Sequence, residues 1–172
     1  MGKNLIDLYT DYLISSFSQT TATGLSTLVD GCLSHDQITT FLAESDLDSK
    51  SLWLHVKPMV RELEKAKGTG VLIFDDSIAV KPYSDENEIV CYHWDHSKKR
   101  HIKGINFLNC LFEKDGISLP VSAEIIEKDE CFIDPKTGKE KRRSSITKNQ
   151  LMQKMLTVTQ NNRVLYDYVL AD

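Results

Sequence analysis

The sequence predicts an α+β or α/β protein, with a helical amino-terminal domain over residues 1–67 and a mixed sheet over residues 68–172. Two observations predict this division. Apolar residues recur at helical spacing before Gly68 and Gly70, and continuous apolar runs typical of strands buried on both faces follow these glycines. A chain of 172 residues, of which 41% are hydrophobic, is long enough for one ordinary domain or two small ones.

Short helices joined by polar turns are expected in the amino-terminal domain. Ser34 is a suitable N-cap, and Gln37 three residues later completes a capping-box pattern. Pro58 is expected to kink or split the last of these helices, because it lacks the backbone amide that a helix interior needs. Such a series is typical both of a helix-turn-helix DNA-binding module and of a plain helical bundle. The helices are expected over residues 5–13, 23–32, after Ser34 and over 49–63.

The second part is expected to contain strands and one crossover helix, in the order strand-strand-strand-helix-strand. The first strand, Val71–Phe74, is expected to end at Asp75 and Asp76. A right-handed crossover through the helix lets the last strand lie parallel to the first and beside it. Residues 81–103 and 134–143 are polar or basic and are expected to be irregular. The other elements are expected over residues 105–112 and 119–126 (strands), 148–159 (helix) and 168–171 (last strand).

Two aspartates follow the first and last of these strands. Asp75 and Asp172 would meet at one edge of the sheet if the strands are parallel neighbours, since adjacent strands are about 4.8 Å apart. Carboxylates this close repel one another unless a cation lies between them. Oxygen ligands suit Mg²⁺ or Mn²⁺, and such ions activate a water or hydroxyl at a phosphodiester. An aspartate after a strand is also a common turn former or helix cap, so a structural role is the alternative.

Four segments of the sequence resemble DDE-type insertion-sequence transposases. LIFDDSIAVK (72–81) resembles the first catalytic strand of that family, and YVLAD (168–172) resembles the strand that delivers its second aspartate. YHWDHSKKRHIKGINFLNCL (92–111) and SHDQITTFL (34–42) resemble the part after the first strand and the helical leader. The resemblance implies an RNase H-like catalytic core, Mg²⁺ or Mn²⁺ as cofactor, and metal-dependent DNA cleavage and strand transfer at the ends of an insertion sequence.

The resemblance also implies which residues form the site. The family pattern of Asp, any residue, then Ser or Thr maps to Asp75 and Ser77, and the second aspartate maps to Asp172. Asp75 and Asp172 are thus the expected metal ligands, with Asp76 a further candidate catalytic residue. The third acidic residue of the family, a Glu on a later helix, has no counterpart here. The RNase H-like sheet is therefore expected to be incomplete, and the chain to be a truncated transposase that is inactive alone.

Two other interpretations stay open: a non-catalytic DNA-binding product that competes with full-length transposase, and a non-functional remnant. A basic and aromatic cluster after the first strand is typical of a loop that grips DNA phosphates or stacks on an unpaired base, and equally of a solvated loop. The expected partners are transposon ends, target DNA, and a second copy of the chain or full-length transposase. The expected DNA contacts are Lys81, Trp94, Lys98, Lys99, Arg100, Lys103, Arg142 and Arg143.

The sequence also indicates where the protein is located and whether its cysteines are oxidised. No secretion signal is recognisable, and no apolar run approaches the ~20 residues of a membrane helix, so a cytoplasmic, nucleoid-associated protein of a prokaryote is expected. The cysteines show no short paired spacing and are expected to be reduced. Cys91, His93, His96 and His101 lack a Cys-x-x-Cys pair, which disfavours a zinc site.

Overall fold

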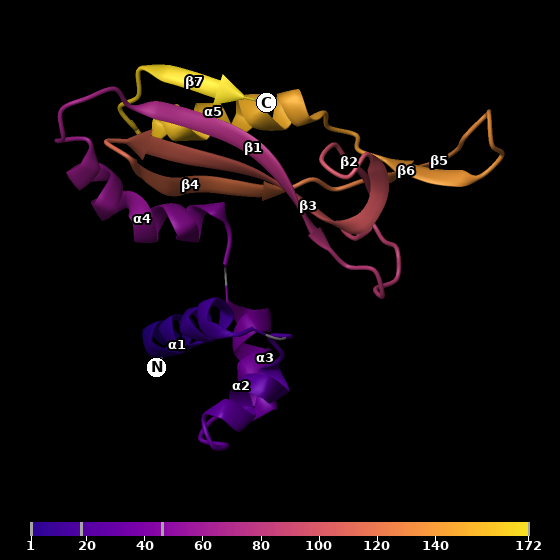
Figure 1. The fold of residues 1–172 in the computed structure, drawn as a ribbon, viewed down its shortest axis with the longest axis horizontal. Coiled ribbons are helices and arrows are strands. Elements are labelled where there is room, and N and C mark those ends of the chain that lie inside the picture. Colours follow the sequence, from indigo (N-terminus) through magenta and orange to yellow (C-terminus); the bar gives the residue numbers. More distant parts are fainter. Residues whose placement is uncertain (1, 18, 46, 172) are drawn as a thin grey trace. The chain divides into compact units, whose positions relative to one another are not determined.

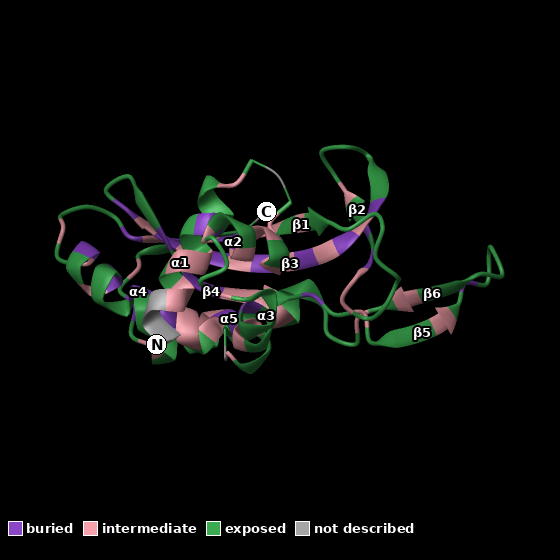
Figure 2. Ribbon diagram, turned by 90° about the horizontal axis from the view of Figure 1, so that it is seen from below, coloured by how far each residue is buried: buried purple, intermediate pink, exposed green. Residues whose placement is uncertain are grey.

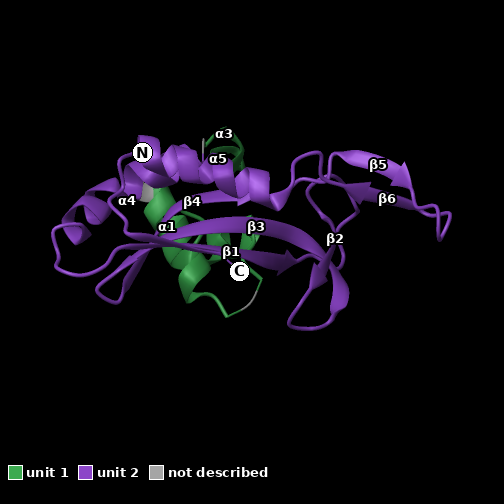
Figure 3. Cartoon of the chain, turned by 90° about the horizontal axis from the view of Figure 1, so that it is seen from above, with its two compact units in different colours: residues 1–46 green, residues 47–172 purple. Residues whose placement is uncertain are grey.

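The computed structural model describes residues 2–17, 19–45 and 47–171. Over these residues the chain is a mixed α+β protein with five helices and a mostly antiparallel main sheet (Figure 1). It folds as two compact units, Met1–Asp46 and Leu47–Asp172 (Figure 3). The division lies earlier in the chain than the expected boundary after residue 67, because helix α4 (Ser49–Leu63) packs its apolar face against the sheet.

The amino-terminal unit has a small apolar core. Over its described residues, three helices surround Tyr12, Leu25 and Ile38. The capping box is confirmed: the Ser34 hydroxyl accepts a hydrogen bond from the Gln37 amide, and the Gln37 side chain accepts one from the Ser34 amide. The helices are α1 (Gly2–Ser15), α2 (Ala22–Leu28) and α3 (His35–Glu44).

Helix α4 runs through Pro58 as one helix, so it is not split there. Pro58 lies on the exposed side of the helix. The hydrogen bond that proline cannot make therefore leaves a carbonyl that water can reach, which lowers the cost of proline inside a helix. The buried residues of α4 recur at helical spacing and join the core of the second unit: Trp53, Val56, Val60 and Leu63.

Strand β3 is the centre of the main sheet. It pairs antiparallel with β1, β2 and β4. Strand β7 pairs with β1 in parallel, from Val71 opposite Tyr168 to Phe74 opposite Ala171, as the crossover through helix α5 (Lys148–Asn161) predicts. The strands are β1 (Val71–Val80), β2 (Cys91–Asp95), β3 (Arg100–Lys114), β4 (Ile117–Ile125) and β7 (Tyr168–Ala171).

Strand β1 continues to Val80, so the prediction that it ends at Asp75 and Asp76 was wrong. Strand β3 is long enough to pair with the whole of β1: Asp75 lies opposite Asn109, and Val80 lies opposite Gly104. Backbone pairing rather than the apolar run therefore sets the length of the strand. Both aspartates lie inside a strand, although Asp75 comes directly after the last residue of β1 that pairs with β7.

Two segments that were expected to be irregular contain strands. Strand β2 and the start of β3 form a hairpin within residues 81–103. Strands β5 (Glu130–Ile133) and β6 (Glu140–Arg143) form a second hairpin, which includes much of the basic segment 134–143 and extends away from the main sheet (Figure 1). Cross-strand pairs of polar and aromatic side chains stabilise such hairpins without any apolar run that the sequence could reveal.

One face of the main sheet is covered by helices α4 and α5. Along β3, the even-numbered residues from Ile102 to Lys114 are buried and the odd-numbered ones between them are half-buried, which Figure 2 shows as purple and pink bands. Phe112 of the buried set shares one core with Val60 of α4 and Met155 of α5. The even-numbered residues of β1 and β3 thus form the covered face, and their odd-numbered residues form the open face.

Arg61 on α4 holds the carboxyl end of α5. Its guanidinium donates to both carboxylate oxygens of Glu64 at 2.8 Å, and to the main-chain oxygens of Asn162 and Arg163. A cation is favourable at these carbonyls because the carboxyl end of a helix carries partial negative charge. Glu64 also accepts a hydrogen bond from the Leu165 amide. Arg61 therefore fixes the turn that leads from α5 into β7.

We expect Arg61→Ala to lower the free energy of unfolding by about 2 to 3 kcal/mol, because Glu64 and the last carbonyls of α5 lose charged hydrogen-bond donors. Chemical denaturation measures this loss. The matched control is Lys65→Ala, which removes an exposed ion pair with Glu62 and should cost about 0.5 kcal/mol or less. Equal losses in the two variants would contradict the role given to Arg61.

Candidate functional site

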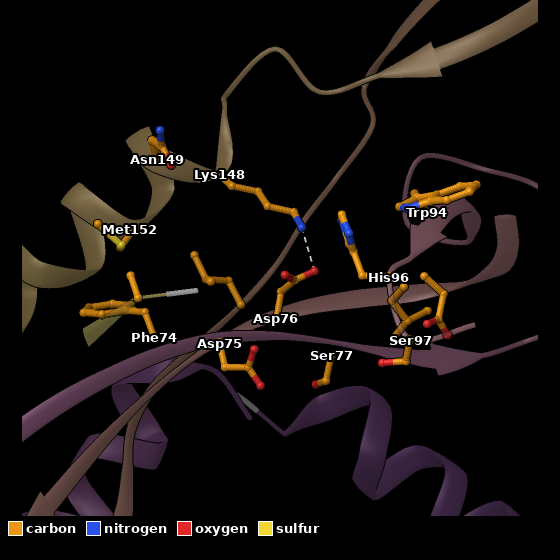
Figure 4. Close-up of a pocket in the computed structure, with 14 residues that line it drawn as sticks. Phe74, Asp75, Asp76, Ser77, Trp94, His96, Ser97, Lys148, Asn149 and Met152 are labelled. Atoms are coloured by element: carbon orange, nitrogen blue, oxygen red, sulfur yellow. Dashed lines mark hydrogen bonds and ion pairs between the residues drawn. The ribbon is translucent and has the colours of Figure 1, made fainter. Parts of the chain in front are cut away.

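A cavity of about 760 Å³ opens beside the middle of β1 (Figure 4). Strand β1, the turn after β2 and the first turns of α5 line it. Met152 lies towards one end of the cavity, Trp94 and His96 lie towards the other, and Asp76 and Lys148 lie between them (Figure 4). The cavity thus combines apolar surface with a few converging polar groups, which is the usual composition of a ligand site.

Asp76 in this cavity is held by hydrogen bonds from two other elements. Its Oδ2 atom accepts a hydrogen bond from Lys148 Nζ at 2.6 Å and one from Asn106 Nδ2 at 3.0 Å. Burial alone would raise the pKa of Asp76, but the hydrogen bonds from Lys148 and Asn106 outweigh it and hold the pKa below its ordinary value. Asp76 is therefore an ionised carboxylate with a fixed orientation.

Asp75 and Ser77 point to the other side of β1, away from Asp76 (Figure 4). Successive side chains of a strand alternate between its faces, so the two neighbouring aspartates lie on opposite faces of the sheet. Asp75 is exposed and takes part in none of the ion pairs among the described residues. Asn109, its partner on β3, donates to the Ser77 hydroxyl at 3.1 Å. The open face therefore carries the Asp-x-Ser pair that the sequence singled out.

The described part of β7 ends beside this pair. Ala171 lies opposite Phe74, the residue directly before Asp75. Asp172, which was expected to be the second metal ligand, lies outside the described residues. Within the described ranges, no group of three or more His, Cys, Asp or Glu side chains comes together that could hold a metal ion.

The residues considered for zinc do not converge. Cys91 and His93 are buried together, with Sγ and Nε2 3.2 Å apart. His96 and His101 instead contact the ring of Trp94, with centroids 6.5 and 5.1 Å away. Cys91 and His93 thus lie in the interior, whereas His96 and His101 lie at the surface.

The residues expected to contact DNA fall into two groups. Those of the first group lie on the β2–β3 hairpin and at the end of β1, where the Lys81 amide donates to the Lys103 carbonyl. Arg142 and Arg143 lie apart on the β5–β6 hairpin, and Arg143 pairs with Glu130. The first group combines exposed cations with one exposed aromatic ring: Lys81, Trp94, Lys98, Lys99 and Arg100, with half-buried Lys103 between them.

Lys148 and Asn106 were not predicted as site residues. Asn106 lies in the middle of β3, and its polar side chain is 2% exposed. Lys148 is the first residue of α5 and lies within the capping box that Thr147 and Gln150 form. A cation at a helix amino terminus is electrostatically unfavourable, and this was the one local signal that could have drawn attention to Lys148.

Comparison of this chain with protein-family models, with curated proteins and with solved structures gives no match. Over the residues that the structure describes, no helix is both long enough and apolar enough to cross a membrane.

The buried His93 side chain should make the stability of the protein depend on pH. It is 5% exposed, and its pKa falls to about 4, mainly through burial and further through the nearby cations Lys128 and Lys148. The folded protein thus holds His93 neutral at pH values where the unfolded chain binds a proton. The stability that this gives is fully present above the unfolded pKa of about 6.5 and is lost as the pH falls towards 4.

We expect the wild-type protein to lose up to about 3 kcal/mol of stability from this site between pH 6.5 and pH 4. His93→Gln should show a flatter curve in the same window, as measured by urea denaturation at a series of pH values. His101→Gln alters an exposed imidazole and should follow the wild-type curve. If His93→Gln and wild type lose stability in parallel, the neutral buried state of His93 is wrong.

Proposed function

We propose that this chain provides strands of the RNase H-like catalytic core of a DDE-type insertion-sequence transposase. The observation that carries the proposal is the parallel pairing of β7 with β1. Its register ends with Ala171 opposite Phe74, and the next residues in the sequence are Asp172 and Asp75. Two carboxylates that were 97 positions apart would thereby come to neighbouring strands of one sheet. Such a pairing gives a physical reason for an aspartate at each of these two positions.

The topology of the sheet supports the RNase H-like part of the proposal. Three antiparallel strands, β1, β3 and β4, precede a helix, and the strand after that helix returns parallel to β1. This is the strand-strand-strand-helix-strand order that the resemblance implies. Strand β2 and the β5–β6 hairpin are additions to that order, inserted between its elements.

One described side chain on the open face is of the kind that a hard divalent cation prefers. Asp75 offers a carboxylate on the open face without an ion-pair partner among the described residues, whereas Asp76 is already engaged by Lys148. Carboxylate oxygens are the protein ligands that Mg²⁺ and Mn²⁺ prefer, and Mg²⁺ commonly takes only one or two of them together with substrate phosphates. We therefore assign Asp75 and Asp172 as the metal ligands. When bound, the ion supplies activation of the attacking oxygen and stabilisation of the leaving oxygen at a phosphodiester.

The residues of this chain hold the parts of such a site in place. The Asn109 side-chain amide donates to the Ser77 hydroxyl, and Asp75 itself lies opposite Asn109 in the pairing of β1 with β3. The exposed cations of the β2–β3 hairpin would bind the phosphate backbone of the element ends. The third carboxylate implied by the resemblance has no counterpart in these 172 residues.

A second function is favoured by the β2–β3 hairpin itself. Its cations Lys99 and Arg100 are exposed and take part in none of the described ion pairs, so they are available to phosphates. Trp94 beside them is 46% exposed, so part of its ring is accessible to an unpaired base. A chain with these groups would bind element ends without cutting them and would compete with full-length transposase.

Catalysis is tested in a fusion protein that joins these 172 residues to a segment supplying the third acidic residue of the family. We expect Asp75→Ala to reduce Mg²⁺-dependent cleavage of element ends at least about 100-fold, because one metal ligand is lost. Asp85→Ala, in the exposed segment after β1, is the control and should cut normally. Normal cutting by Asp75→Ala would remove the basis for the transposase assignment.

DNA binding is tested on the chain itself. We expect Lys99→Ala/Arg100→Ala to weaken binding to element ends and to reduce the slope of log affinity against log salt by about 2, because two phosphate contacts are lost. Lys65→Ala/Lys67→Ala removes the same charge from the segment after α4 and should leave the slope unchanged. A slope that is equal in both double variants would exclude the hairpin as the DNA-binding surface.

A further inference from the structure

Strands β5 and β6 form a two-stranded ribbon that pairs with no other strand among the described residues. The ribbon extends away from the main sheet in both views of Figures 1 and 3. It is also basic, in a chain whose net charge is -4: residues 130–143 contain five cations and three acidic residues. The ribbon is thus a protruding, positively charged element that the main sheet does not need.

One face of the ribbon holds it together. Residues directly opposite one another in an antiparallel pair share a face. Arg143 donates to Glu130 at 2.7 Å, and its guanidinium lies 5.4 Å from the centre of the Phe132 ring. Lys141 on the same face forms an ion pair with Asp134. The two cations of this face are therefore already neutralised within the ribbon.

The turn at the tip of the ribbon is fixed by its own hydrogen bonds. The Asp134 carboxylate accepts from the Lys136 amide at 2.9 Å, and the Asp134 carbonyl accepts from the Gly138 amide at 2.8 Å. Gly138 has a φ of 66°, a conformation that glycine adopts without strain. Lys136 and Lys139 in this turn are exposed and take part in none of the ion pairs among the described residues. The tip therefore presents two cations on a fixed backbone.

The second face of the ribbon has no such internal contacts. Ile133 is 64% exposed and lies opposite exposed Glu140, directly before the tip. Among the described residues, no side-chain hydrogen bond or ion pair engages the members of this face: Cys131, Ile133, Glu140 and Arg142. An apolar, an acidic and a basic side chain are thus displayed together beside the exposed lysines.

The dimensions of the ribbon match the major groove of duplex DNA. That groove is about 12 Å wide and admits a two-stranded ribbon, whereas the minor groove is about 6 Å wide. Each strand of four residues is about 13 Å long, which exceeds the major-groove depth of about 8.5 Å.

The chemistry of the second face also favours the major groove. Thymine methyl groups there offer apolar surface to Ile133, and cytosine amino groups offer donors to Glu140. The base edges of A·T pairs in the minor groove carry acceptors alone, which a carboxylate cannot pair with. Glu140 is therefore compatible with one groove and unfavourable in the other.

We propose that the β5–β6 ribbon enters the major groove of duplex DNA, with Lys136 and Lys139 on phosphates and the Ile133–Glu140 pair towards the base edges. The proposal rests on the DNA-binding function proposed above and deepens it, because it adds a second surface and names the form of DNA that this surface takes. The β2–β3 hairpin can bind single strands as well, whereas the ribbon requires a groove.

The experiment measures binding of the 172-residue chain to a labelled duplex of mixed sequence and to one of its single strands, by fluorescence anisotropy over a salt series. Lys136→Ala/Lys139→Ala should weaken duplex binding and reduce the slope of log affinity against log salt by about 2, because two phosphate contacts are lost. Single-strand binding should stay as in the wild type. The control, Lys57→Ala/Lys154→Ala, removes equal charge from exposed positions of α4 and α5 and should change neither.

The groove is identified by methylation with dimethyl sulfate, which reacts at guanine N7 in the major groove and at adenine N3 in the minor groove. The wild-type chain should protect guanine N7 and leave adenine N3 reactive. Ile133→Ala should weaken duplex binding about 5-fold without changing the salt slope, because an apolar contact and no charge is lost. Circular dichroism checks folding, and Ile133→Thr, which keeps a β-branched side chain, replaces Ile133→Ala if that variant unfolds.

The outcomes distinguish this proposal from the function on which it rests. If Lys136→Ala/Lys139→Ala binds the duplex as the control does, the role of the ribbon is overturned, while DNA binding by the β2–β3 hairpin stands. Equal losses on duplex and single strand, protection of adenine N3, or unchanged binding by Ile133→Ala would overturn insertion into the major groove. If the wild-type chain shows no salt-dependent binding to either probe, the DNA-binding function itself is wrong and this inference falls with it.

Discussion

The parallel contact between β7 and β1 is the interaction on which the proposed chemistry depends. Strand β7 has four residues, all exposed, so its own side chains contribute little to its position. Its start is fixed instead by hydrogen bonds: the Gly70 amide donates to the Asp167 carboxylate at 2.8 Å, and the Asp167 amide donates to the Gly70 carbonyl at 2.7 Å. A side chain at position 70 would meet the Leu165 carbonyl at 2.9 Å, so glycine is needed for this approach. The register of the strand end is therefore decided at its beginning, by the contacts between Gly70 and Asp167.

The two faces of the main sheet have different roles. The covered face contains the apolar core shared by α4, α5 and β3, and at its margin the polar network around Asp76. The open face carries Asp75 and Ser77 among half-buried apolar residues such as Ile73. A single strand thus presents one carboxylate that is engaged by neighbours and one that is accessible. Alternation of side chains, which every strand has, is sufficient to make this separation.

The sequence predicted the elements that have a strong local pattern. The capping box at Ser34, the helix beginning at Lys148 and the last strand over residues 168–171 agree with the structure, because caps and apolar periodicity act over a few neighbouring residues. The continuation of β1 beyond Asp76, the two hairpins and the grouping of α4 with the sheet were not predicted. Each depends on pairing or packing between segments that are distant in the sequence. The same holds for the site. The Asp-x-Ser pair could be identified from the sequence, whereas the contacts of Asp76 with Lys148 and Asn106 join three separate elements.

The outer edge of β7 has a consequence for handling the protein. Among the described strands, β7 pairs with β1 alone, so the main-chain donors and acceptors on its other side meet solvent. Tyr168 and Leu170 are 63% and 55% exposed beside that edge. An extended segment from any other molecule could replace the water there, and exposed apolar edges of this kind are templates for aggregation. A lysine in place of Tyr168 or Leu170 would be the first substitution to consider for keeping concentrated samples dispersed.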